Sequence, residues 1–163
     1  MESRSKVLGH ASHPILIVFP LGLLAVSVVF DAIYLLNPGK EWATVSYWML
    51  VSGLVGGVVA AVPGWIDWFA IPSGTRAKAI GLYHGLGNVL ALGVFGASWF
   101  LRHEDYIHPP ALAQYLSFGA TVLVMGTGWL GGELVERLGV GVDRGANLNA
   151  PSSLSGKPAD APR

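Results

Sequence analysis

Five side chains in this sequence are of the kinds that bind transition metals in proteins: His10, His13, Asp67, His84 and Glu133. Imidazole and carboxylate groups together make an N/O ligand set suited to zinc, iron or copper. The chain has no cysteine, so it provides no thiolate, iron–sulfur or covalent c-type haem site by itself. Whether the five can act together depends on the elements that position them.

Those elements are four long apolar segments, at about residues 14–36, 45–70, 79–102 and 111–136. About 20 helical residues cross a hydrocarbon core of about 30 Å, and only closed backbone hydrogen bonding is stable there. The pattern predicts an all-α fold, a four-helix transmembrane bundle with up-down-up-down topology and short loops. It divides the chain into a transmembrane domain at 1–142 and a polar, flexible C-terminal tail at 143–163.

The composition agrees with a lipid environment. The chain is 52% hydrophobic and 12% charged, whereas a soluble domain carries about 25% charged residues. A net charge of zero gives no electrostatic support for a nucleic-acid partner. We expect the lipid bilayer to be the main partner. Four spans and short loops leave no room for a separate catalytic domain, which favours a chain that is not an enzyme on its own.

The positive charges predict the orientation. An even number of spans puts both termini on one side, which we call side A, and the loops near residues 37–44 and 103–110 on side B. Lys and Arg near span ends accumulate on the cytoplasmic side of a membrane. Side A carries Arg4, Lys6, Arg76, Lys78, Arg137 and Arg144, with Lys157 and Arg163 in the tail, against Lys40 and Arg102 on side B. Both termini are therefore predicted to be cytoplasmic.

A helical rise of about 1.5 Å per residue places the metal-binding types near side A. Measured from the middle of its own span, His84 lies about 9 Å toward that side, Asp67 about 13 Å, Glu133 about 15 Å and His13 about 18 Å. His10 lies just outside the first span. Ionisable groups within spans are costly, face the bundle interior and mark functional sites. All four helices thus contribute to one predicted polar cluster.

This cluster has two functional interpretations. A b-type haem would take His13 and His84 as axial ligands, although their estimated depths differ by roughly 9 Å. A transition metal ion would take His10, His13 and His84 with Asp67 or Glu133. Asp67 could instead orient a ligating imidazole through a hydrogen bond.

The alternative is a non-catalytic scaffold or partner subunit, in which the polar cluster fixes helix packing. Glycines four residues apart, as in Gly53/Gly57, Gly81/Gly85 and Gly128/Gly132, favour close helix contacts in lipid, within one chain or in a homo-oligomer. Asp31 lies toward side B, and we expect a structural role for it, with a hydrogen bond to Tyr47 or Trp48. A transporter has less support, because the sequence has no convincing inverted repeat.

Several motifs together resemble one known family. They are His-Pro-Ile-Leu-Ile-Val-Phe-Pro-Leu-Gly-Leu at 13–23, Gly-Trp-Ile-Asp-Trp at 64–68, His84 with Asn88, and Gly-Trp-Leu-Gly-Gly-Glu-Leu at 128–134. The chain is similar over about residues 8–150 to the bacterial membrane proteins called domain of unknown function 2231.

That resemblance implies a multi-pass protein of the bacterial inner membrane. Members fused to Rieske or cytochrome c domains imply a membrane redox partner. Many members carry histidines where this chain has Val18 and Leu138, so any ligand role at those positions does not transfer. The prediction is a membrane protein of unknown biochemical role that binds haem b or a transition metal.

Overall fold

The computed structural model describes residues 1–161 and is a bundle of four long helices, as the sequence predicts. The helices are α1 (Ser12–Leu36), α2 (Lys40–Ala70), α3 (Arg76–Arg102) and α4 (Ala111–Gly132), which continues into a π-helical turn at Glu133–Arg137. Each is long and apolar enough to cross a membrane. Outside the bundle lie a two-stranded antiparallel hairpin, β1 (Lys6–Val7) with β2 (His10–Ala11), and a 3-10 turn at Ser153–Ser155.

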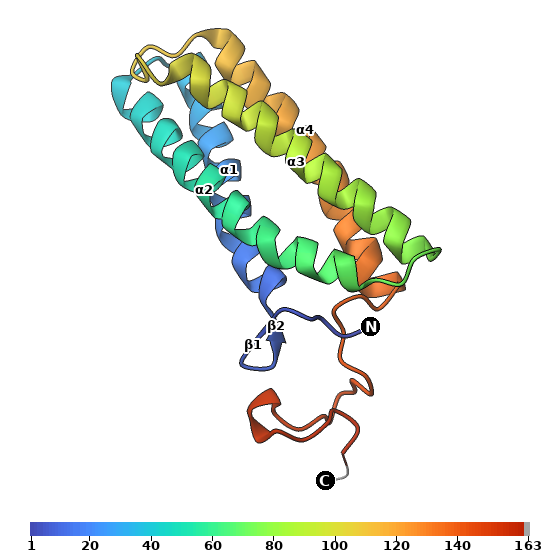
Figure 1. The fold of residues 1–163 in the computed structure, drawn as a ribbon. Coiled ribbons are helices and arrows are strands. Elements are labelled where there is room, and N and C mark those ends of the chain that lie inside the picture. The colour runs from blue at the N-terminus through green and yellow to red at the C-terminus, as the bar shows by residue number, and fades with distance from the viewer. Residues whose placement is uncertain (162–163) are drawn as a thin grey trace.

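Local sequence explains where the helices begin and bend. α2 starts at Lys40, earlier than the apolar pattern indicates, because the helix begins with two charged residues, Lys40 and Glu41. The carboxylate of Glu41 is favourable at the positive end of the helix. The side chain of Thr75 caps α3 by accepting a hydrogen bond from the Lys78 backbone N–H at 3.1 Å. α2 bends in its last third (Figure 1), where Pro63 lacks the N–H that would bond one turn back.

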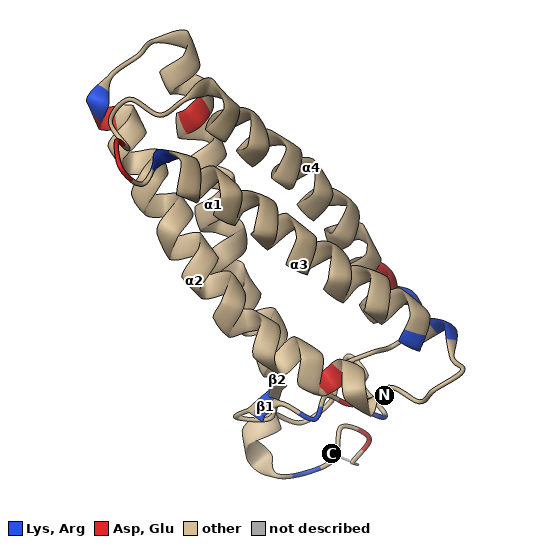
Figure 2. Cartoon of the chain, turned by 45° about the horizontal axis from the view of Figure 1, so that its top comes forward, with Lys and Arg blue, Asp and Glu red and all other residues tan. Residues whose placement is uncertain are grey.

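The four helices form two antiparallel hairpins. α1 packs mainly against α2 and α3 mainly against α4, with sparser contact between the hairpins. The central core takes one fully or nearly buried residue from each helix: Leu24, Leu50, Phe95 and Ala120. Figure 1 shows the N- and C-terminal segments beyond the same end of the bundle, side A. Charged residues gather at the two ends, and the middle of the bundle is nearly free of them (Figure 2).

The two hairpins repeat one buried pattern. In α1 the buried residues include Pro20, Leu24, Ser27 and Asp31, and in α3 they include Ala91, Phe95, Ser98 and Arg102. Taken in order, each residue of the α1 list lies 71 positions before the matching residue of the α3 list, as Asp31 does before Arg102. His13 and His84 have this separation too (13 to 84).

A corresponding match relates the second helices of the hairpins. Ser46, Leu50, Gly53 and Ala60 of α2 are buried at positions that match buried Ala113, Ser117, Ala120 and Thr127 of α4. The fold is thus a parallel repeat of one helical hairpin, with a pseudo-two-fold axis that runs along the bundle. This type of repeat differs from the inverted repeat sought in the sequence.

A buried ion pair closes the side-B end of the bundle. Arg102 Nη1 lies 2.8 Å from Asp31 Oδ1, and Nη2 lies 3.1 Å from Oδ2. Both side chains are 1% exposed. Ser46 of α2 donates to Asp31, and Ser98 of α3 and Ser117 of α4 accept from Arg102 at 2.8 and 3.4 Å. All four helices therefore contribute to this buried polar knot. The expected bond from Asp31 to Tyr47 or Trp48 is therefore wrong, because the inward face of α3 supplies a stronger partner.

Candidate functional site

Toward side A, the pseudo-two-fold axis passes between His13 and His84. Their ring centres are 6.4 Å apart, and the ring planes are nearly perpendicular, at 89°. Each histidine precedes its member of the Asp31–Arg102 pair by the same five helical turns (13 to 31 and 84 to 102). Since that pair fixes the two helices at one level, the histidines also lie at one level, about 27 Å away along the axis. The expected depth difference between them was wrong.

The same backbone contact holds both histidines. His13 Nδ1 is 2.8 Å from the carbonyl oxygen of Ala60 on α2, and His84 Nδ1 is 2.8 Å from that of Thr127 on α4. A carbonyl oxygen only accepts, so the neutral ring carries its proton on Nδ1. Nε2 on the far side of each ring then keeps its lone pair. This is the arrangement in which histidine binds metals, with the other ring nitrogen bonded to a carbonyl or carboxylate.

A glycine makes room beside each ring. A Cβ at Gly64 would lie 3.0 Å from His13 Nδ1, and a Cβ at Gly131 would lie 3.1 Å from His84 Cε1. Each glycine follows the carbonyl-bearing residue by one helical turn (60 to 64 and 127 to 131). Both positions belong to motifs already noted in the sequence, but their role appears only once the hairpins are paired.

Asn88 orients the His84 side of the site. Its Nδ2 donates to the His84 backbone carbonyl at 2.8 Å, and its Oδ1 accepts from Thr127 Oγ1 at 2.8 Å. The same Nδ2 is 3.4 Å from His84 Nδ1 and 3.3 Å from Nε2. Nearly equal distances place the amide over the ring face, away from the direction of either lone pair. Asn88 therefore steadies the ring without a preference for either ring nitrogen.

The other three expected ligands have separate partners. His10 lies in β2, with Nε2 3.2 Å from Ser153 Oγ of the tail. Glu133 forms an ion pair with Arg76 at 2.6 Å. Asp67 accepts from Ser3 Oγ at 2.7 Å and from the Arg4 backbone N–H at 2.6 Å.

The expected five-ligand cluster is consequently not assembled. Within residues 1–161, no group of three His, Asp or Glu side chains lies close enough to hold one metal ion. The reason is the N-terminal segment, which folds back over the end of α2 and occupies Asp67. Arg76 at the start of α3 likewise occupies Glu133. Of the five residues, the fold brings His13 and His84 together.

The fold and the site define a four-helix membrane protein, built from a repeated hairpin, with a histidine pair on the pseudo-two-fold axis. Residues 9–144 match the family described as predicted membrane protein DUF2231, and the chain belongs to that family. No curated protein and no solved structure is significantly similar to the chain.

Proposed function

We propose that His13 and His84 are the two ligands of one metal centre that transfers electrons within the membrane. The observation that carries this proposal is the ring separation of 6.4 Å. Two imidazoles bound trans to one metal have ring centres about 6.3 Å apart, since each metal–nitrogen bond is about 2.0–2.1 Å and the ring centre lies roughly 1.1 Å behind the nitrogen. Edge-to-face aromatic pairs span a similar range. The hydrogen bonds from Nδ1 of both histidines to backbone carbonyls favour a metal site over a simple aromatic pair.

The centre is either the iron of a b-type haem or a bare metal ion such as copper, and both use the same two ligands. Support for a haem comes from the sparse contact between the hairpins, since a flat ring would lie in the plane that separates them. Neither histidine is fully buried, so the space around the rings is not closed by protein. A bare ion needs less room and suits the rings at their present distance.

A haem iron with two histidine ligands has no free position for substrate and supplies one-electron transfer. The protein residues hold the two rings and set the position of the proton on each. A carrier of this kind needs a donor and an acceptor. We therefore include a membrane redox partner, or a second copy of the chain, in the proposal.

The proposed setting is the bacterial inner membrane, with both termini in the cytoplasm. Support comes from the charge distribution, which is more asymmetric than the sequence alone indicates. Arg102 is 1% exposed and paired with Asp31, so it does not act as a loop charge on side B. Lys40 is the one Lys or Arg left to face water at that end of the described chain.

The test is the metal content and absorption spectrum of the detergent-purified full chain. We expect one haem or one metal ion per chain in the wild type, and a loss of at least tenfold in both His13→Ala and His84→Ala. A Soret band identifies haem, and elemental analysis without that band identifies a bare ion. His103→Ala and His108→Ala are matched controls, because both histidines lie in the loop on side B.

The scaffold interpretation predicts a different result. If the wild type purifies with no metal and binds neither added haem nor added copper, the metal proposal fails. A helix bundle that unfolds more easily in His84→Ala, with no metal at any stage, would show that the histidine pair serves packing alone.

A further inference from the structure

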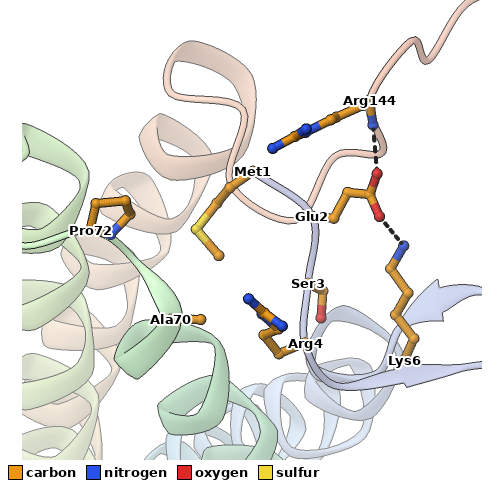
Figure 3. Close-up of a pocket in the computed structure, with 8 residues that line it drawn as sticks. All are labelled: Met1, Glu2, Ser3, Arg4, Lys6, Ala70, Pro72 and Arg144. Carbon is orange, nitrogen blue, oxygen red and sulfur yellow. Dashed lines mark hydrogen bonds and ion pairs between the residues drawn. The ribbon is translucent and has the colours of Figure 1, made fainter.

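A second candidate site lies outside the bundle, at its side-A end. It is an open pocket of about 590 Å³ between the N-terminal segment, the end of α2 and the start of the tail. Figure 3 shows the pocket, with the guanidinium groups of Arg4 and Arg144 directed into it from opposite walls. Ala70, the last residue of α2, and Pro72 in the loop after it line a third wall.

Backbone bonds hold both arginines in place. The Arg4 backbone N–H donates to Asp67 at 2.6 Å, and the Arg144 backbone N–H donates to Glu2 Oε1 at 3.2 Å. In the part of the chain that the structure describes, neither guanidinium has a hydrogen-bond or ion-pair partner. The segments are therefore anchored while the two charged heads remain available.

The acidic groups near the pocket are already engaged. Hydrogen bonds from the Arg144 backbone N–H and from Lys6 hold the pKa of Glu2 below its usual value. Lys6 bridges Glu2 and Asp143, and these two carboxylates raise the pKa of Lys6. Two positive charges thus remain without a counter-charge at the mouth of the pocket.

We infer that Arg4 and Arg144 bind a phosphate-bearing anion at the level of the lipid headgroups. The planar guanidinium presents paired N–H donors that match phosphate oxygens. The pocket lies beyond the last turn of α2, where a span leaves the hydrocarbon, so an anionic lipid headgroup is within reach. A soluble phosphate compound has the same chemistry. This site is independent of the histidine pair.

The test compares the wild type with Arg4→Gln/Arg144→Gln, both as full-length protein in a neutral detergent. Binding is measured with added phosphatidylglycerol, by native mass spectrometry, and with inorganic phosphate, by calorimetry. Arg137→Gln/Lys157→Gln is the matched control, because it removes two positive charges from the same side without altering the pocket lining. Circular dichroism checks that each variant keeps its helices.

Lipid retention that is at least about tenfold weaker in the Arg4/Arg144 variant, and unchanged in the control, would support a headgroup site. Phosphate binding lost in the same variant, without lipid retention, would support the same site with a soluble ligand. If the wild type binds neither probe, or if the two double variants lose binding equally, the inference is overturned.

Discussion

At the residue scale, the site depends on small features that direct two imidazoles toward each other. His13 and His84 could be predicted as candidates, because ionisable residues inside apolar spans are unusual. The distance between the two rings could not be predicted, since depths measured from the middle of each span ignore how the two helical hairpins are aligned along the bundle. That register is set by side chains such as Asp31 and Arg102, whose pairing no single helix shows. The contacts that Ala60 and Thr127 make with the two imidazoles carry no signal in the sequence, because both are made by backbone carbonyls.

A residue-scale prediction concerns the glycine beside His84. A methyl group at Gly131 would lie 3.1 Å from Cε1 of that ring, so Gly131→Ala must displace the imidazole. Since loss of groups that orient a metal ligand costs 10–100-fold in affinity, we expect metal retention to fall by about tenfold.

Gly132→Ala is the matched control, because a Cβ there meets nothing within 4 Å. It should retain the wild-type metal content, measured by elemental analysis or by the haem absorbance. Equal metal content in the two variants would show that the position of the His84 ring does not matter for binding.

At the element scale, polar contacts fix the helices at both ends of the bundle. The sequence predicts the four helices well, because long apolar runs permit little else in lipid. It does not predict the pairing of α1 with α3 through a buried ion pair, or the strand-like N-terminal segment. Those depend on contacts between residues more than 60 positions apart, as for Asp67 with Arg4 and Asp31 with Arg102.

The ion pair gives an element-scale prediction. Arg102→Met leaves Asp31 as an unpaired buried charge, which typically costs about 3–5 kcal/mol in the free energy of unfolding. Asp31→Leu/Arg102→Met removes both charges and should be closer to the wild type than the single variant is. Unfolding in increasing SDS would measure all three proteins. A double variant less stable than Arg102→Met would contradict this account of the knot.

A second element-scale prediction concerns the N-terminal segment. Asp67→Ala removes the carboxylate that accepts from Ser3 and from the Arg4 backbone N–H, so residues 1–11 should detach from α2. We expect trypsin to cleave after Arg4 or Lys6 several times faster than in the wild type, as followed by mass spectrometry. Metal content should stay unchanged. A loss of metal in Asp67→Ala would instead return this residue to the metal site.

At the scale of the whole molecule, the protein is a repeated helical hairpin. Its pseudo-two-fold axis passes between His13 and His84 toward side A and between Asp31 and Arg102 toward side B. The sequence pattern allowed a bundle to be predicted, but the repeat was not recognised, because the halves share burial and spacing more than residue identity. Ser27 and Ser98 are identical, whereas Asp31 and Arg102 have opposite charge. A symmetric hairpin pair would place like charges together there, so the two halves had to differ.

The orientation in the membrane is testable because the chain has no cysteine. Single cysteines at Lys40 and Ser73 would report the two sides, since both positions lie in or next to exposed loops. In intact cells we expect a membrane-impermeant maleimide to label Lys40→Cys, and to label Ser73→Cys only after the membrane is opened. The reverse pattern would place the termini outside.

The most direct test of the histidine pair is X-ray absorption at the edge of the metal that copurifies with the protein. We predict two imidazole nitrogens at about 2.0–2.1 Å from the metal in the wild type, and one in His84→Ala reconstituted with the same metal or haem. A wild-type spectrum without two histidine ligands, or an unchanged spectrum in His84→Ala, would contradict the claim that His13 and His84 share one metal centre.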